Sequence, residues 1–585
     1  MHQLAPLLPY FRPYRLYLVG GIVSIVITAG VGLLAPLVIG RSVDAMAANV
    51  AASVLLAYGG LLLAVTAVQG IFQFAQRMIL VTMSRHVEYD LGNDFFRHLE
   101  RLDAGFFQRY TTGDLMARAT NDLHAVRMAC GPAIMYASNT VVTAIGALAF
   151  LLHIHPRMTL VALAPLPFAA AATKLFGEKI HALFQKVQES FSDLSTRVQE
   201  NLAGVRVVRA YVQEGPEKSR FEGLNRRYVE DNRRLIRWNA AFHPVLHGVI
   251  GLGFAAVLGY GGRLLVAGEI TIGQFVMFHL FLGKLVWPMI AIGWVINIAQ
   301  RAAASFGRMH AVMTTEPAVR DEAVRDAQAP ERDVEIRGAV RFDALTFGYD
   351  AGRPVLRGLD LEVEAGRTVA IVGRTGSGKS TLLSLLPRTF DPPPGQLLVD
   401  GVDVRELPLA ALRDAVAMVP QESFLFSTTI AANVAFGRRG ASEAEIREAV
   451  RLAGLDRDVE GFPQGLETMV GERGLTLSGG QKQRVALARA LLRDAPILAL
   501  DDCLSAVDTE TEERILGNLR TVFPGRTVFQ VSHRVSAVRG ADLIVVLERG
   551  EIRERGTHDE LLARDGLYAD LHRRQMLEEQ LAAAV

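Results

Sequence analysis

Residues 369–381 read Val-Ala-Ile-Val-Gly-Arg-Thr-Gly-Ser-Gly-Lys-Ser-Thr, and this stretch decides the fold of the second half of the chain. Its first four residues are small or β-branched and predict a buried strand. The next residues match Gly-x4-Gly-Lys-Ser, the phosphate-loop pattern, between a strand and a helix. Such a loop curls its backbone N–H groups around phosphate oxygens, and the helix adds its positive N-terminal end. The stretch therefore predicts a nucleotide site in an α/β domain.

Individual residues of this loop predict both ligands, ATP and Mg²⁺. Lys379 would reach the β- and γ-phosphates, and the Ser380 hydroxyl would coordinate Mg²⁺. A chance glycine-rich turn is the alternative, but a complete match between a strand and a helix argues against it. The residues that we expect to bind the nucleotide here are Gly373, Thr375, Gly376, Ser377, Gly378, Lys379, Ser380 and Thr381.

A second buried strand is predicted over residues 497–500, Ile-Leu-Ala-Leu, and it ends in Asp501 and Asp502. In phosphate-loop NTPases, a carboxylate at the end of such a strand completes the Mg²⁺ coordination shell. Asp501 is our candidate for that carboxylate. An acidic residue that merely ends the strand is the alternative.

Another glycine-containing turn occurs at residues 477–481, Leu-Ser-Gly-Gly-Gln, at the start of a predicted helix. This turn is a second candidate for anion binding. A single chain has no evident use for two such turns on one nucleotide. The residues alone leave two alternatives, a second phosphate site or a site that a partner chain completes.

Long apolar runs dominate the chain up to about residue 310. A helix needs about 20 apolar residues to cross a bilayer core. Buried core helices are the alternative for any single run, but six runs together favour an all-α, six-helix transmembrane domain. The six runs are residues 16–39, 54–81, 132–154, 159–176, 245–267 and 275–296.

The loops between these runs predict the orientation in the cytoplasmic membrane. Long polar stretches at about 82–130 and 177–242 are rich in arginine and lysine. By the positive-inside rule they face the cytoplasm, as do both termini. Polar residues inside spans are functional candidates because they are costly there. The candidates are Asn139, His247, His279, Lys284, Asn297 and Trp287, which lies beside Pro288.

Composition and charge define the remaining organisation. The net charge of +1 gives no reason to expect nucleic acid as a partner. The two cysteines, Cys130 and Cys503, form no disulfide framework and suit a chain whose soluble part faces the reducing cytosol. Residues 311–337 are polar and read as a linker. We therefore predict a transmembrane domain over 1–310, this linker, and a nucleotide-binding domain over 338–585.

Taken together, these motifs resemble the ABC exporter family, in which a transmembrane domain is fused to an ABC ATPase domain. Leu477–Gln481 resembles the family signature and is the most specific of the motifs. Tyr349 resembles the aromatic residue that stacks on adenine, and Gln421 resembles the glutamine of the Q-loop. Residues 505–508 resemble the D-loop, and His533 resembles the switch histidine.

This resemblance implies a dimer in which each ATP lies between the phosphate loop of one chain and the signature of the other. It implies ATP hydrolysis that drives export of a hydrophobic or lipid-like substrate, as in multidrug exporters, with membrane lipids around the spans. The implied roles are catalysis for Asp502, His533 and Gln421, Mg²⁺ coordination for Ser380, Gln421 and Asp501, and ATP contacts for Tyr349, Ser478, Gly479, Gly480 and Gln481.

One position departs from the family pattern. The residue after the strand-end aspartate is usually glutamate, the general base, and here it is Asp502. The aspartate side chain is shorter by one carbon–carbon bond, about 1.5 Å. A misplacement of about 1 Å can lower a rate about 100-fold. We therefore expect this chain's own site to be slow. With its intact signature, the chain resembles one half of the heterodimeric exporters that have one degenerate site, and this resemblance implies a heterodimer. A homodimeric exporter or flippase with Asp502 as a working base is the alternative.

Three other classes of ABC protein are alternatives. The six apolar runs argue against a soluble ABC ATPase that acts on DNA or ribosomes. Importers usually carry their ATPase on a separate chain, whereas here both parts are fused. A membrane ABC ATPase with a gating or regulatory role is left open by the sequence.

Overall fold

The structure is a computed structural model that describes residues 2–321, 335–350, 352–471, 474 and 477–583. It divides into two compact units. The first contains Met1–His98 and Leu115–Thr314, and the second contains Leu99–Asp114 and Thr315–Val585. Residues 99–114 thus pack with the nucleotide-binding unit, although they precede the third apolar run. Of the predicted linker 311–337, residues 322–334 lie outside the described residues.

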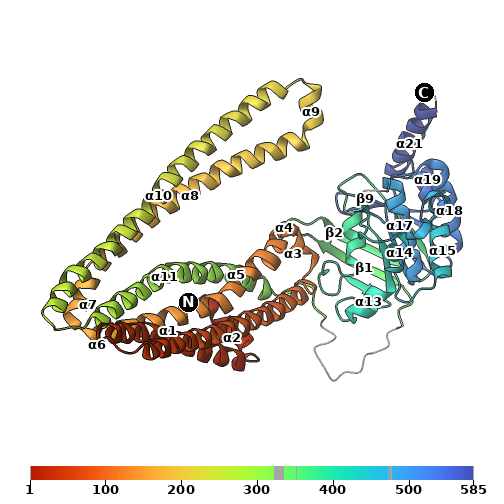
Figure 1. Ribbon diagram of the computed structural model, residues 1–585. Helices are drawn as coiled ribbons and strands as arrows, with labels where there is room; N and C mark the ends of the chain where they lie inside the picture. Colours follow the sequence, from red (N-terminus) through yellow and green to blue (C-terminus); the bar gives the residue numbers. More distant parts are fainter. Residues whose placement is uncertain (1, 322–334, 351, 472–473, 475–476, 584–585) are drawn as a thin grey trace. The chain divides into compact units, whose positions relative to one another are not determined.

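The first unit is built from long helices (Figure 1). Among the described residues, six helical segments are long and apolar enough to cross a membrane, which confirms the predicted six-helix domain. A short 3-10 helix η1 (His2–Phe11) precedes them. The long helices are α1 (Arg15–Ala47), α2 (Ala52–Leu99), α6 (Ile134–Ile154), α7 (Pro156–Leu163) with α8 (Leu166–Ala203), α10 (Glu214–Val266) and α11 (Ile272–Met313).

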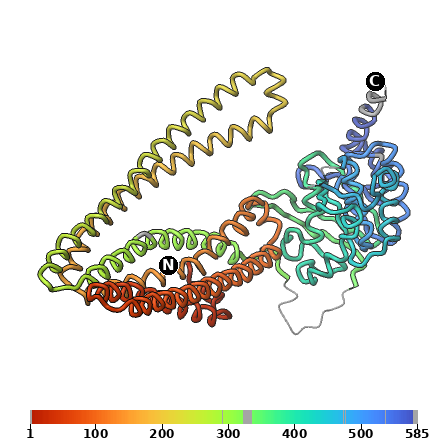
Figure 2. Tube along the Cα trace, in the orientation of Figure 1, coloured from red at the N-terminus to blue at the C-terminus, as the bar shows by residue number. Residues whose placement is uncertain are grey.

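Shorter helices continue or connect these spans. Pro165 separates α7 from α8, because a proline lacks the N–H that would continue the helix. The helices α8 and α10 pack side by side and are joined through α9 (Val205–Ala210) at the tip of their hairpin, as Figure 2 shows. The segment before α6 consists of α4 (Thr112–Ala117), η2 (Arg118–Asp122), α5 (Leu123–Met128) and η3 (Ala129–Ala133).

Two carboxylates fix α11 within this unit. At its start, Asp44 of α1 accepts hydrogen bonds from the Thr271 hydroxyl at 2.9 Å and from the Gly273 N–H at 2.7 Å. Near its end, the buried Asp122 accepts a hydrogen bond from Ser305 at 2.8 Å and pairs with Arg308. Asp122 thus braces the end of α11 against the segment that precedes α6.

The second unit contains two β-sheets. One is antiparallel, in the order β2-β1-β4-β5, and the other has the order β10-β9-β3-β8-β7-β6, in which β9 through β6 run parallel. The strands are β1 (Val340–Phe347), β2 (Leu356–Val363), β3 (Thr368–Val372), β4 (Leu397–Val399), β5 (Val402–Asp403), β6 (Val416–Val419), β7 (Ile497–Asp501), β8 (Thr527–Val531), β9 (Leu543–Glu548) and β10 (Glu551–Gly556). This confirms the predicted α/β domain.

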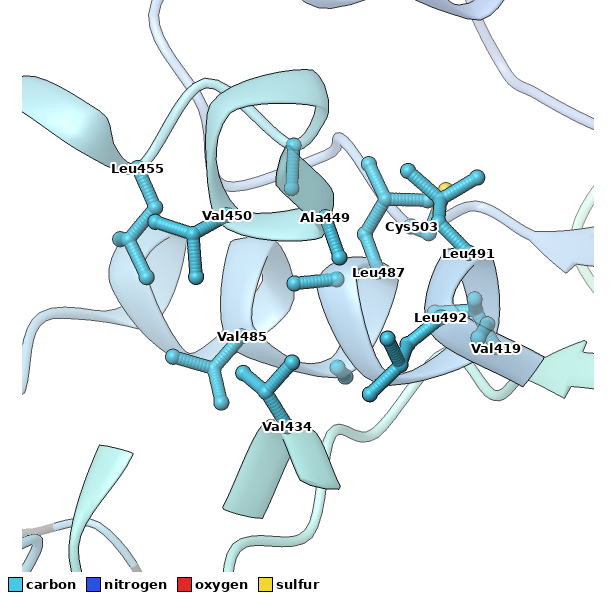
Figure 3. Packing of buried hydrophobic residues seen from close by; sticks show 14 of the residues in the cluster. Val419, Val434, Ala449, Val450, Leu455, Val485, Leu487, Leu491, Leu492 and Cys503 are labelled. Atoms are coloured by element: carbon cyan, nitrogen blue, oxygen red, sulfur yellow. The ribbon is translucent and has the colours of Figure 1, made fainter. Parts of the chain in front are cut away.

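Helices surround these sheets. The helices of this unit are α3 (Ala104–Arg109), α12 (Lys379–Leu385), α13 (Leu409–Ala415), α14 (Ile430–Ala435), α15 (Glu443–Leu452), α16 (Asp456–Gly461), η5 (Gly465–Glu467), α17 (Gly479–Arg493), α18 (Thr509–Val522), α19 (Val535–Val538), α20 (His558–Ala563) and α21 (Leu567–Ala583). The largest apolar core surrounds α17, whose Val485 and Leu487 pack among residues of α14 and α15 such as Val434 and Val450 (Figure 3). This core holds α17 firmly at the position where it begins.

A buried arginine links the start of the second unit to its sheets. The Arg388 side chain is 0% exposed and donates to Asp391 from Nε at 2.8 Å. It also donates to the carbonyl oxygens of Val404 at 3.3 Å and Arg320 at 3.0 Å. A single guanidinium therefore satisfies acceptors from three separate segments.

The variant Arg388→Ala should destabilise this unit by about 3–5 kcal/mol, because it leaves Asp391 and two carbonyls without their buried partner. Urea titration of the detergent-solubilised chain, read by protease susceptibility of the nucleotide-binding unit, measures the change. The control Arg341→Ala breaks a pair with Asp343 whose two side chains are 56% and 47% exposed. It should cost about 0–1 kcal/mol. Equal losses in both variants would contradict this account.

Candidate nucleotide-binding site

The strand order of the parallel sheet brings the predicted site residues together. The phosphate loop follows β3, Gln421 follows β6, Asp501 ends β7, and His533 follows β8. The strands β3, β8, β7 and β6 are consecutive neighbours in this order. Because ligands of open α/β sheets bind outside the carboxyl ends of parallel strands, these four segments meet at one edge.

A cavity of about 170 Å³ lies at this edge. Most of its lining consists of residues predicted from the sequence, joined by Val355 and Val531, which the motifs did not single out. The predicted residues that line it are Thr375, Gly376, Gly378, Lys379, Ser380, Thr381, Gln421, Asp501, Asp502 and His533. Gly373, Ser377 and Tyr349 lie outside this lining, and so do the four signature residues Ser478, Gly479, Gly480 and Gln481.

The backbone of the phosphate loop requires glycine at two positions. Gly373 has φ +154°, and a Cβ there would lie 2.2 Å from the Leu547 carbonyl oxygen. Gly378 has φ +105°, and a Cβ there would lie 2.7 Å from Leu356 Cδ2. Residues with a side chain rarely adopt such φ values. Glycine thus lets the loop close tightly before α12 begins at Lys379.

Lys379 supplies the only lysine or arginine side chain among the described residues that line the cavity. It is 6% exposed, and its Nζ donates to the carbonyl oxygens of Gly373 at 2.8 Å and Arg374 at 3.0 Å. Burial lowers the pKa of this ammonium group, and the charges of Asp501 and Asp502 oppose that shift. The arrangement places a positive charge where phosphate oxygens would arrive.

Asp501 lines the same cavity as this lysine, and the residue is 3% exposed. Burial raises the pKa of Asp501, and so does the charge of Asp502, whereas a hydrogen bond from Ser380 and the charges of Lys379 and His533 lower it. Ser380, Gln421 and Asp501 together offer hydroxyl, amide and carboxylate oxygens around one cavity. Mg²⁺ prefers oxygen ligands, with one or two carboxylates and the phosphates of its substrate. The donor set therefore fits that ion.

Asp502 lies in the left-handed region, with φ +47°. Its N–H donates to the Val531 carbonyl at 3.0 Å, and its own carbonyl accepts from the Ser505 hydroxyl at 3.0 Å. The residue is 9% exposed and lines the cavity beside His533. Hydrogen bonds on both sides therefore hold the backbone that carries this carboxylate.

Tyr349 lies beside the phosphate loop and contacts it through its hydroxyl, which is 3.0 Å from the Thr381 hydroxyl. It is 47% exposed, so its ring is open to a base. Phe390 packs edge-on against it with ring centroids 5.0 Å apart. Phe390 also lies near α3, where a Cβ at Gly105 would come within 3.9 Å of the Phe390 ring. The side chain of Asp103, at the start of α3, accepts a hydrogen bond from the Ala318 N–H at 2.9 Å.

The signature segment forms the N-terminus of α17. Ser478 caps this helix, and Gln481 Oε1 accepts a hydrogen bond from the Ser478 N–H at 2.9 Å. A Cβ at Gly480 would lie 2.8 Å from the Ala506 carbonyl oxygen, so the D-loop packs directly on this turn. The N-terminus of a helix suits an anion, yet these residues do not line the cavity of their own phosphate loop.

A hydrogen-bonded link connects this segment to Asp502. Gln483 of α17 donates to the Ser505 hydroxyl at 3.0 Å and accepts from the Ala506 N–H at 2.9 Å. Ser505 in turn donates to the Asp502 carbonyl. Sequence reasoning assigned no role to Gln483, although it lies two residues after Gln481. These hydrogen bonds connect the signature helix α17 to the backbone of Asp502.

Two family models match the chain. The model described as "ABC transporter transmembrane region" matches residues 18–289, and the model described as "ABC transporter" matches residues 356–505. The first match covers most of the first unit together with residues 99–114 of the second, and the second match lies within the second unit.

Relatives match over nearly the full length. The chain is 37% identical to a "Probable multidrug resistance ABC transporter ATP-binding/permease protein" of Bacillus subtilis, over 97% of each chain. It is 37% identical to a "Multidrug resistance-like ATP-binding protein" of Escherichia coli, over 99% of this chain and 98% of that one. It is 35% identical to an "ATP-dependent lipid A-core flippase" of Syntrophus aciditrophicus, over 88% and 85%. A solved bacterial Atm1-family ABC exporter with ATP bound superimposes with a TM-score of 0.78 at 30% identity, covering 96% of this chain and 98% of that one.

Proposed function

Because this chain belongs to the ABC transporter family, as a half-transporter of the multidrug and lipid exporter type, we propose that it exports an amphipathic substrate as one half of a heterodimer. In this dimer its own ATP site hydrolyses slowly. ATP hydrolysis by its ABC domain and six-span membrane insertion are properties of the family. Both termini and the nucleotide-binding unit face the cytoplasm in this proposal, in keeping with the arginine-rich loops.

The site residues divide the work on ATP. Tyr349 stacks on adenine, the loop N–H groups hold the phosphates, and Lys379 exchanges its carbonyl partners for phosphate oxygens. Ser380, Gln421 and Asp501 hold Mg²⁺, which neutralises charge on the phosphates when bound. Asp502 orients the attacking water, and His533 donates to the phosphate. The cavity shared by Lys379, Ser380, Gln421, Asp501, Asp502 and His533 supports their assignment, and the contact of Tyr349 with Thr381 supports that of Tyr349.

The signature acts on the partner's nucleotide. Ser478, Gly479, Gly480 and Gln481 form a helix N-terminus, with backbone N–H groups suited to a phosphate. Their absence from the lining of this chain's own cavity supports a role in a second chain's site. The partner is thus a second half-transporter whose ATP is completed by this signature.

The observation that carries the slow site is the fixed backbone of Asp502. A shorter side chain could still reach the water if its backbone moved forward. Here Val531 and Ser505 hold the N–H and the carbonyl of Asp502 by hydrogen bonds. We therefore expect no shift of the backbone that would compensate for the shorter side chain. The shortening of about 1.5 Å exceeds the misplacement of about 1 Å that can lower a rate about 100-fold.

In a pair of two copies of this chain, in which each signature completes the other copy's site, the variant Asp502→Glu should therefore raise ATP turnover about 100-fold, by restoring the reach of the base. Steady-state phosphate release in lipid nanodiscs measures it. The control Asp343→Glu changes a surface aspartate and should leave turnover unchanged. Rapid turnover by the unmodified lone chain, abolished by Asp502→Asn, would contradict the slow-site heterodimer.

A homodimeric exporter or flippase is the second candidate, and one observation favours it. His533 lines the same cavity as Asp502, so a histidine and a carboxylate that could serve hydrolysis are both present. Rapid turnover by the lone chain in the experiment above would select this candidate. ATP-dependent substrate flux into vesicles separates either exporter from a membrane ATPase that only gates.

A further inference from the structure

A polar cavity of about 240 Å³ lies among the spans of the first unit. Four helices contribute to it, namely α1, α2, α6 and α11. Its lining residues are Thr28, Ala29, Gly32, Leu33, Gln69, Gln73, Gln76, Asn139, Thr143, Lys284, Trp287 and Pro288. Of the polar candidates predicted from the sequence, Asn139, Lys284 and Trp287 meet here, whereas His247, His279 and Asn297 do not line it. We call it the Lys284 cavity.

Three glutamines of α2 form one wall, and sequence reasoning missed them. Gln69, Gln73 and Gln76 are spaced four and three residues apart, which places them on one face of a helix. That spacing within an apolar run was the available signal. Gly32 of α1 leaves room for the first of them, because a Cβ there would lie 3.1 Å from Gln69 Nε2.

The deepest of these amides has an unused hydrogen-bonding atom. Gln76 is 7% exposed, and its Oε1 has no hydrogen-bond partner in the part of the chain that the structure describes. A buried polar atom without a partner costs about 1–3 kcal/mol. Rotation of the amide exchanges oxygen for nitrogen, so this position offers a ligand either an acceptor or a donor.

Lys284 gives the cavity its charge. It is half-buried, it is the only charged residue among the described lining residues, and it forms no ion pair with the described carboxylates. None of the six apolar runs contains an aspartate or glutamate. A charge within the membrane is costly unless something neutralises it. The spans themselves therefore supply no counter-charge, and a bound anion would supply one.

We propose that the Lys284 cavity binds the anionic head group of an amphipathic substrate. The inference rests on the proposed export function and adds the substrate class to it. Lys284 pairs with the carboxylate, sulfonate or phosphate, while the amides of Gln69, Gln73 and Gln76 donate around it. A whole drug-sized ligand needs about 300–1,000 Å³. The cavity therefore holds the head group, and the apolar tail extends past the exposed Trp287.

Quenching of Trp287 provides a direct binding assay. The chain has three tryptophans, so Trp238→Phe and Trp294→Phe leave Trp287 as the sole reporter. The probe is dodecanoate that carries bromine beside its carboxylate, added without ATP to the full chain in phosphatidylcholine nanodiscs. Its counterpart has a trimethylammonium head on the same brominated chain. We expect the anion to quench at a concentration at least about 10-fold lower than the cation.

Variants then test the residues. Lys284→Met should weaken anion binding about 10- to 100-fold, since a charged hydrogen bond is lost, and Lys284→Arg should restore most of it. Gln76→Leu should weaken it about 5-fold. The matched control is Lys174→Met, which removes a lysine of the fourth apolar run that does not line the cavity. Equal quenching by anion and cation, or unchanged anion binding in Lys284→Met, would overturn the proposal.

Two further experiments identify the source of the anion and test anion binding separately from export. Replacing phosphatidylcholine with phosphatidylglycerol suppresses quenching if the natural anion is a lipid head group, and leaves it unchanged if the anion is a soluble amphiphile. Selective anion binding by a chain that shows no ATP-dependent flux with any partner would refute the proposed export function. It would still support anion binding in the Lys284 cavity. ATP-dependent flux without selective anion binding would refute anion binding in the Lys284 cavity and leave the proposed export function standing.

Discussion

Lys379→Met should lower the affinity of this chain for ATP by about 100-fold or more. The ammonium group is the only lysine or arginine charge among the described residues of the phosphate cavity, and it is already nearly buried. A hydrogen bond to a charged group contributes about 1.5–3 kcal/mol, and Lys379 would contact two phosphates. Losing about 3 kcal/mol corresponds to a little more than 100-fold in the dissociation constant.

Titration with a fluorescent ATP analogue, on the chain in detergent, measures this loss. The matched control is Arg374→Met, which removes an exposed positive charge from the same loop without touching the cavity lining. Its affinity should stay within a few-fold of the unmodified chain, about 1 kcal/mol at most. Unchanged affinity in Lys379→Met would mean that the nucleotide binds elsewhere.

The second large effect concerns the signature helix. Gly479→Asp should lower ATP turnover of the assembled pair about 100- to 1,000-fold, because its carboxylate adds a negative charge beside the N–H groups that would stabilise the phosphate. The chain itself should still fold. A Cβ at Gly479 would meet Ala506 Cβ at 3.4 Å, an ordinary contact, and an acidic residue in the first turn suits the helix dipole.

A comparison of two variants at this position makes the test specific. Gly479→Ala adds the same Cβ without the charge, so most of the turnover of the pair should survive. ATP binding by the lone Gly479→Asp chain should equal that of the unmodified chain, since Gly479 does not line its own cavity. Loss of ATP binding in that lone chain would show that the signature serves the site on its own phosphate loop, against the proposed exchange.

Several parts of the fold and the site were predictable because they depend on neighbours in sequence. The phosphate loop needs a strand, glycines at fixed spacing and a following helix, all within residues 369–385. The six spans need only length and apolarity, and the structure confirms them. The roles of Asp502, Gln421 and His533 came from resemblance to a family, and they remain predictions for the experiments above.

Other parts were not predictable, and each depends on packing between distant segments. Gln483 reaches Ser505 because α17 packs against the D-loop, which no local pattern encodes. Residues 99–114 join the nucleotide-binding unit through Asp103 and Ala318, although they adjoin an apolar helix in sequence. The Gln69–Gln76 face had a visible spacing, but only the neighbouring Lys284 turns that face into a charged cavity.

The sequence by itself determined which segments cross a membrane, where the phosphate loop lies and which chemical groups could serve it, because hydropathy, glycine spacing and residue type act locally. The tertiary structure alone decided that Gln421, Asp501 and His533 face one cavity and that the signature does not. The physical reason is strand order. The neighbours β3, β8, β7 and β6 are far apart in the chain, and their order in the sheet arises from hydrogen bonds and core packing rather than from any local motif.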